Sequence, residues 1–368
     1  MLNSRLLKNE EKAIYALREL YSGFGYSQFK MSKFEEYDFY VRNMHSLISN
    51  GIITFTDTTG KLMALKPDVT LSIIKNSKDI EGFVTKLYYD ESVYRISGGS
   101  GSYKEITQTG LECIGDIGIY DVCEVVSLAI KSLMIIDGEY MLDISHAGMV
   151  SALFEACDIS AEIQNKALEY IRAKNIDGIN TLYNNGVISE ISRDVCVALT
   201  HTYKNYKEVV SAFSKLAQNS EVMDAMNEFG AVMYALQQAG LTDKINIDFS
   251  IIGNMKYYSG IIFKGYINGI PQAVLSGGQY DKLAAKMGKN SGAIGFAVYL
   301  DMLERYGNDS QEYDADIVIL KDNNTSSAEL LNAVENLSKE GNRVIVLGKI
   351  PENFKYKRLI KAEEIGEV

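Results

Sequence analysis

The hydrophobic and polar positions change period several times along the chain, and each change predicts a new element. Residues 9–20 repeat with the period of an amphipathic helix, which ends before Gly23. Residues 53–65 alternate on both sides of Thr58-Thr59-Gly60, which predicts a β-hairpin. A short helix is predicted after Pro67, because proline suits the first turn of a helix.

Two longer strand patterns and a helix follow. Residues 83–96 and 105–115 are rich in β-branched and aromatic side chains, and the small residues between them suit a flexible connection. A helical pattern runs from Asp121 to Ile135, and residues 141–148 predict a strand that leads into a turn. Strands, a helix and more strands in this order favour an antiparallel α+β core.

Residues 149–238 have an almost entirely helical pattern and contain no proline, which predicts a helical insertion between β segments. Strand patterns resume at 245–251 and 257–267, and Asn268-Gly269 predicts a type I′ hairpin. The glycine-rich segment 276–281 predicts a turn. A further helix, strand and helix complete this part of the chain.

The pattern changes again near the C-terminus. A strand at 315–320, a helix from Ser326 to Lys339 and a strand at 342–348 predict a small α/β unit. We therefore expect a core over residues 1–306 that contains the helical insertion, and a small, truncated unit over residues 311–368.

Composition narrows the function classes. The formal net charge is -11, which argues against nucleic-acid binding, since that usually requires a basic face. The chain has no apolar run of about 18 residues, so we expect no membrane span. Its first residues lack the apolar core of a signal peptide, which favours a cytoplasmic location.

Cysteine and histidine spacing gives no support to metal or redox chemistry. The four cysteines show no CxxC spacing and are expected to be small buried hydrophobic residues in a reducing compartment. The three histidines are scattered. We expect no metal and no cofactor. The four cysteines are Cys113, Cys123, Cys157 and Cys196, and the three histidines are His45, His146 and His201.

Several segments, in this order, resemble class II aminoacyl-tRNA synthetases of the histidyl type. They are similar to the dimer-forming first motif, the amino-acid-pocket segment, the arginine-bearing second motif, the two histidyl signatures and the third motif. The matching residues are, in turn, 23–36, 65–70, 94–115, 254–263 together with 276–281, and 291–303. The resemblance covers nearly all of the first 306 residues, and the unit over residues 311–368 resembles a truncated form of the α/β anticodon-binding module of these synthetases. It implies the class II synthetase fold, and it implies a homodimer although Ser32 replaces the usual proline of the first motif.

The resemblance also implies a pocket for histidine. Asp68 and Glu112 could balance an ammonium group, and Thr70 and Gln108 could supply directional hydrogen bonds. Even spacing along one predicted strand places Gln108 and Glu112 on the same face. Tyr257 and Tyr258 offer aromatic walls. The candidate histidine-binding residues, with the arginine of the second motif included, are Asp68, Thr70, Arg95, Gln108, Glu112, Tyr257 and Tyr258.

Structural roles remain open for several of these residues. Asp68 could simply cap the helix after Pro67, and Glu112 could be a charge on a strand edge. If Tyr257 and Tyr258 lie on a strand, they point to opposite faces and only one of them faces the pocket.

The arginines that a synthetase needs to hold ATP are largely missing. Arginine suits this task because its planar fork grips phosphate oxygens in pairs. Arg95 is present, but Ser102, Met302 and Gly253 occupy positions where the family has arginine. Lys256 is a possible substitute that lacks the fork geometry.

A synthetase-like chain that retains the amino-acid pocket but lacks most of the ATP-binding arginines resembles the regulatory subunits of ATP phosphoribosyltransferase. That resemblance implies a non-catalytic subunit of a hetero-oligomer with the short-form catalytic subunit. It also implies feedback by histidine in histidine biosynthesis. The alternatives are a divergent histidyl-tRNA synthetase and a free-standing histidine-binding paralogue.

Overall fold

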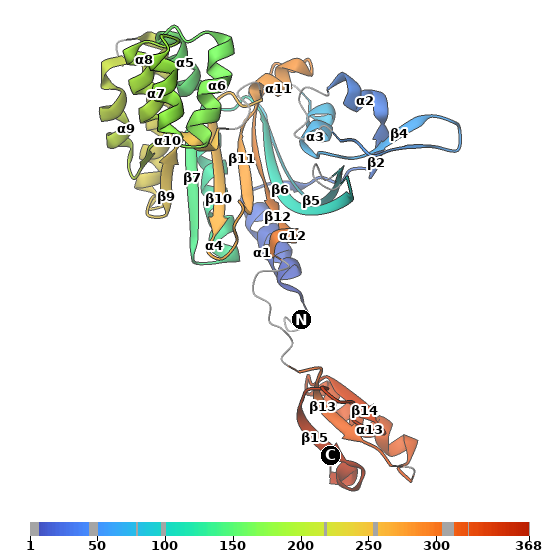
Figure 1. The fold of residues 1–368 in the computed structure, drawn as a ribbon. Coiled ribbons are helices and arrows are strands. Elements are labelled where there is room, and N and C mark those ends of the chain that lie inside the picture. Colours follow the sequence, from blue (N-terminus) through green and yellow to red (C-terminus); the bar gives the residue numbers. More distant parts are fainter. Residues whose placement is uncertain are drawn as a thin grey trace. The chain divides into compact units, whose positions relative to one another are not determined.

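The computed structural model describes residues 7–43, 51–78, 80–96, 101–216, 219–252, 257–303, 313–322 and 324–367. The chain forms two compact units, Met1–Tyr306 and Gly307–Val368 (Figure 1). The first is built on a large mixed sheet flanked by helices, which confirms the predicted α+β class.

The large sheet has nine strands in the order β1-β5-β6-β12-β11-β10-β7-β9-β8. Its pairings are mainly antiparallel, but β1 pairs with β5 and β7 with β9 in parallel, so the prediction of an antiparallel sheet was incomplete. The strands are β1 (Ser27–Gln28), β5 (Val84–Ile96), β6 (Tyr103–Gly115), β7 (Tyr140–His146), β8 (Thr202–Tyr203), β9 (Ile245–Asp248), β10 (Ile261–Ile267), β11 (Leu275–Gln279) and β12 (Gly292–Tyr299).

Helices α1 (Asn9–Gly23), α4 (Ile119–Ile136) and α12 (Leu300–Leu303) cover one face of this sheet, and the opposite face carries polar side chains beside a second, smaller apolar core. The large apolar core contains Leu17 of α1, Val125 of α4 and Leu303 of α12. Leu111 of β6 and Phe296 of β12 are paired across the two strands and belong to the same core. Glu112 and Gly295, one position away from that pair, therefore lie on the opposite face.

A second, three-stranded sheet in the order β2-β4-β3 lies in the same unit. Its hairpin, β3 (Thr54–Thr56) and β4 (Leu62–Leu65), is the predicted one. The remaining elements nearby are β2 (Phe34–Glu36), α2 (Tyr37–Arg42), α3 (Thr70–Asn76) and α11 (Asp281–Lys286). Helix α3 begins just after Pro67, as the sequence predicts.

The predicted helical insertion is a bundle of helices interrupted by the two-residue strand β8. It comprises α5 (Ala147–Ala156), α6 (Ala161–Arg172), α7 (Ile176–Asn184), α8 (Glu190–Ala198), α9 (Tyr206–Phe213) and α10 (Ser220–Gln238). Phe213 and Phe229 pack edge-on against Phe249, which follows β9, so the bundle shares the core of the large sheet.

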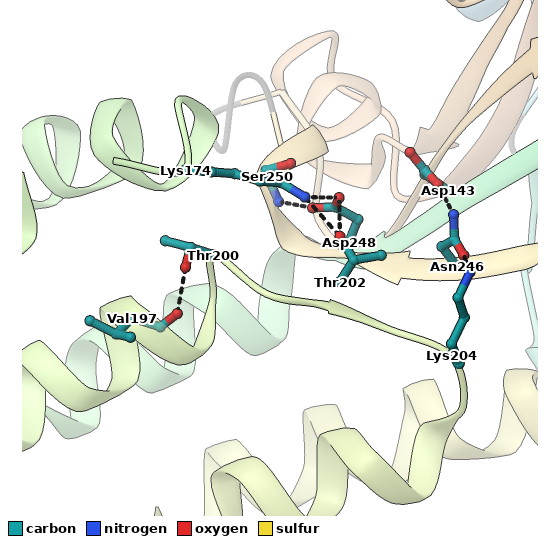
Figure 2. A network of polar contacts seen from close by, with 9 residues as sticks. All are labelled: Asp143, Lys174, Val197, Thr200, Thr202, Lys204, Asn246, Asp248 and Ser250. Atoms are coloured by element: carbon teal, nitrogen blue, oxygen red, sulfur yellow. Dashed lines mark hydrogen bonds and ion pairs between the residues drawn. The ribbon is translucent and has the colours of Figure 1, made fainter. Parts of the chain in front are cut away.

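A polar network fastens this bundle to the end of the sheet (Figure 2). Lys174 Nζ lies 2.6 Å from a carboxylate oxygen of Asp248, which also accepts hydrogen bonds from Thr202 and the backbone N–H of Ser250. Burial opposes ionisation of Asp248, but these hydrogen bonds outweigh it and lower the pKa of the carboxyl group.

Replacing Lys174 with alanine should destabilise the protein by about 1–2 kcal/mol, because the buried Asp248 carboxylate loses its cation while Lys174 itself is half exposed. Lys61→Ala, which breaks an exposed ion pair with Glu36, is the matched control and should have a smaller effect. Since the pKa of Asp248 is lowered on folding, the contribution is present at neutral pH and disappears as pH falls below about 4. Urea unfolding at neutral and acidic pH measures both effects; equal losses in the two variants would contradict this role.

The second unit is a three-stranded parallel sheet in the order β14-β13-β15 with one helix packed on it. Its elements are β13 (Ala315–Leu320), α13 (Ser327–Lys339), β14 (Val344–Leu347) and β15 (Tyr356–Lys361). The sequence predicts the first three elements. Strand β15 was missed because its exposed basic residues interrupt the alternation of apolar and polar side chains.

Two local predictions were wrong. Of Asn268-Gly269, only Gly269 has a positive φ, whereas a type I′ turn requires two such residues. The connection from β10 to β11 is instead the longer loop 268–274, which contains Pro271. Residues 276–279 of the predicted glycine-rich turn form strand β11, where Gly277 and Gly278 are paired on both sides.

Candidate functional site

One pocket on the Glu112 face of the large sheet brings together all of the sequence-predicted candidates. It is lined by Asp68, Thr70, Arg95, Gln108, Glu112, Tyr257 and Tyr258. The sequence analysis missed the other polar side chains of the lining, namely Tyr89, Ser276, Tyr280 and Tyr299. For Tyr89 a signal was available, because it lies at even spacing from Arg95 along one predicted strand.

Strand β6 supplies two of the candidates from one face, as predicted. Gln108 and Glu112 are both buried, at 4% and 2% exposure. Strand β6 lies between β5 and β12, so Glu112 is an interior residue of the sheet. The alternative that Glu112 is a strand-edge charge is therefore wrong.

Glycines form the floor beneath these side chains. A Cβ atom added to Gly295 of β12 would lie 1.7 Å from Glu112 Oε2, and one added to Gly110 would lie 2.6 Å from the Tyr89 hydroxyl. A Cβ atom on Gly278 would touch the ring of Tyr258 at 3.0 Å. The absence of side chains at these positions leaves the room that the carboxyl group and the aromatic rings occupy.

Glu112 is held by two hydroxyl groups. Thr70 Oγ1 donates to Glu112 Oε1 over 2.7 Å, and the hydroxyl of Tyr280 donates to Oε2. Burial raises the pKa of Glu112 to about 8, although both hydrogen bonds favour the ionised form. Burial in the pocket therefore favours the protonated form of this carboxyl group.

Asp68 combines the two roles that the sequence left open. Its Oδ1 accepts a hydrogen bond of 3.0 Å from the backbone N–H of Leu71 in the first turn of α3, and the side chain also lines the pocket. Burial raises the pKa of Asp68, while the Leu71 hydrogen bond and the charge of Arg95 partly oppose the shift. Asp68 thus both accepts a hydrogen bond from the first turn of α3 and is a buried acid of the pocket.

Tyr257 and Tyr258 stand together at the pocket, contrary to the strand alternative. They precede β10, which begins only at Ile261, so the alternation of a strand does not apply to them. Their ring centroids are 4.7 Å apart at an interplanar angle of 72°, and Tyr257 also lies 5.9 Å from the ring of Tyr280. Three aromatic rings therefore form one wall.

Arg95 is the one positively charged side chain among the described residues that line the pocket. Its Nε donates to the carbonyl oxygen of Pro67 over 3.1 Å. Met302 of α12 is packed against the large apolar core. Gly253 and Lys256, which the sequence analysis singled out, lie outside the described residues.

The described parts of the chain contain no group of three or more His, Cys, Asp or Glu side chains that could hold a metal ion. Within the same residues, no helix has the length and apolar character needed to cross a membrane.

Comparisons with known proteins agree with this architecture. Residues 2–303 match the family described as histidyl-tRNA synthetase. An ATP phosphoribosyltransferase regulatory subunit from Clostridium kluyveri is 31% identical over 88% of this chain and 85% of its own length. A protein of the same name from Clostridium acetobutylicum is 27% identical over 92% of this chain and 86% of its own length.

Solved structures show the same fold. A protein from Bacillus halodurans described as an ATP phosphoribosyltransferase regulatory subunit/histidyl-tRNA synthetase matches with a TM-score of 0.77 and 21% identity, over 96% of this chain and 93% of that one. The ATP phosphoribosyl transferase (HisG:HisZ) complex from Thermotoga maritima contains a chain with a TM-score of 0.61 and 19% identity, covering 79% and 97% of the two chains. With a family match over most of its length and a relative above 30% identity, the chain belongs to the ATP phosphoribosyltransferase regulatory subunits of the histidyl-tRNA synthetase family.

Proposed function

We propose that this chain is a non-catalytic regulatory subunit that binds histidine and supports the short-form catalytic subunit of ATP phosphoribosyltransferase in the cytoplasm. The observation that carries the proposal is the pocket itself, where two buried acids and a wall of tyrosines face one arginine. An amino acid with a basic aromatic ring complements this set, because it offers an ammonium group, a carboxylate and a polar ring.

The partner is supported by the relatives. Proteins named regulatory subunits of ATP phosphoribosyltransferase match along most of this chain, and the Thermotoga maritima structure is a complex of ATP phosphoribosyl transferase. We infer that a homodimer of this chain assembles with catalytic subunits, and that histidine acts through the interface between them. Linkage requires each site to affect the other reciprocally.

A reconstitution experiment tests this function. Adding the purified chain to a short-form catalytic subunit should produce phosphoribosyl transfer that the catalytic subunit alone lacks, and histidine should suppress it. The partner should change the affinity of the chain for histidine by the same factor by which histidine changes its affinity for the partner. Failure to form a complex and to change the rate would overturn the proposal.

The same preparation separates the two alternatives. A divergent histidyl-tRNA synthetase would form histidyl adenylate without the partner. A free-standing histidine-binding protein would bind histidine but would not associate with the catalytic subunit.

A further inference from the structure

The floor of the pocket is built of small residues and ends at one large side chain. Strand β12 presents Gly295, Ala297 and Tyr299 to the pocket, because these positions alternate with residues of the large apolar core. On the neighbouring strand β11, Ser276 is paired with Ala297 and Gly278 with Gly295. Of these floor residues, only Tyr299 has a side chain large enough to end the floor.

Tyr299 is turned toward the pocket and away from the core. Its neighbours Val298 and Leu300 belong to the large apolar core, whereas the partly buried Tyr299 lines the pocket. Its hydroxyl oxygen forms a hydrogen bond of 2.8 Å with that of Ser276. Because Ser276 is paired with Ala297, two residues before Tyr299, this bond draws the tyrosine side chain back over the floor.

Tyr299 lies at the end of the pocket that is nearer to Arg95. It is paired with Gln108 of β6, and Gln108 lies between Glu112 and the residue of β6 that is paired with Arg95. Arg95 is the one cation among the described lining residues, so a ligand carboxylate is favoured at this end. A group attached to that carboxylate therefore extends toward the ring of Tyr299.

We propose that Tyr299 restricts the pocket to amino acids whose carboxylate is free, because its ring occupies the space that a group attached to the carboxylate needs. This inference rests on the proposed function, in which histidine is the ligand. Four residues of strand, about 13 Å, separate Gly295 from Tyr299. The Glu112 carboxyl and the Tyr299 ring each take up part of that length. The remainder suits one amino acid and excludes its peptides, esters and adenylate.

Calorimetric titration of the full chain with three ligands tests the proposal. Histidine carries the free carboxylate. Histidinamide replaces it with an uncharged group of the same size, and histidylglycine attaches a further residue at the same point. We expect histidylglycine to bind about 10- to 100-fold more weakly than histidinamide, because a well-packed site must shift to admit the added atoms.

Two variants assign this difference to the ring of Tyr299. Tyr299→Ala opens the end of the floor and should remove most of the difference between the two ligands. Tyr299→Phe keeps the ring without the hydroxyl and should discriminate as the parent chain does. The quantity compared is the ratio of the two dissociation constants, which a general loss of stability or of affinity does not change.

Tyr234→Ala is the matched control for the loss of a tyrosine. Tyr234 of α10 is 65% exposed and is not among the described residues that line the pocket. This variant should keep the ratio of the parent chain. Near-ultraviolet circular dichroism of all three variants shows whether the fold persists.

Other outcomes overturn the proposal in distinguishable ways. Equal binding of histidylglycine and histidinamide by the parent chain would show that Tyr299 does not limit the ligand. Continued exclusion in a folded Tyr299→Ala variant, or admission of histidylglycine by Tyr299→Phe, would reject the role of the ring. These results leave the regulatory function standing, since it requires only that histidine bind. Failure of histidine itself to bind would reject this inference together with the proposed histidine binding.

Discussion

Replacing Gly295 with alanine should weaken histidine binding on the order of 100-fold, because the new methyl group occupies the place of the Glu112 carboxyl. The added Cβ atom would lie 1.7 Å from Glu112 Oε2 and 2.5 Å from the carbonyl oxygen of Leu111. The first contact displaces the acid, and the second forces β12 away from β6. Calorimetric titration with histidine measures the loss.

Gly138→Ala is the matched control, since a Cβ atom at Gly138 meets nothing within 4 Å. It should bind histidine as the parent chain does. Near-ultraviolet circular dichroism of both variants shows whether the fold persists. A folded Gly295→Ala variant with unchanged affinity would mean that histidine does not occupy this pocket.

We also expect the purified chain to lack the synthetase activity that forms histidyl adenylate. Histidine-dependent ATP–pyrophosphate exchange by the purified chain should stay at background, because each missing preorganised charge donor costs roughly 100- to 1,000-fold in rate. Arg95 supplies one guanidinium group, whereas Met302 is a partly buried apolar residue packed against the core and Ser102 is uncharged.

Met302→Arg alone should not restore exchange, since one arginine does not replace several that act as a unit. The test needs a control against contaminating synthetase, and Arg95→Ala provides it: contaminating activity is indifferent to this substitution. Exchange above background that disappears in Arg95→Ala would establish the chain as a synthetase.

The sequence predicted most reliably the features that depend on strand alternation or on a helix start signal. The even spacing of Gln108 and Glu112 predicted a shared face, and the structure places both in one pocket. Pro67 predicted the start of α3. These features depend on neighbours along the chain, which the sequence displays directly.

Features that depend on distant pairing were harder to predict. Gly277 and Gly278 suggested a turn because glycine is common in turns, but strands on both sides convert the segment into β11. The need for glycine at Gly295 arises from Glu112, nearly two hundred residues earlier. The role of Tyr280 could not be predicted for the same reason, because its contact with Glu112 joins two segments that only the fold brings together.

Assigning the pocket to histidine and the second unit to an anticodon-binding-like module are both predictions. The first is addressed by the calorimetric experiments above.

The tyrosine wall has a practical consequence. The chain contains no tryptophan, so its near-ultraviolet absorption and fluorescence come mainly from tyrosine. Five of its 24 tyrosines surround one pocket. The site thus carries its own chromophores, and occupancy can be followed by difference spectroscopy in the unlabelled chain, alone or within an assembly.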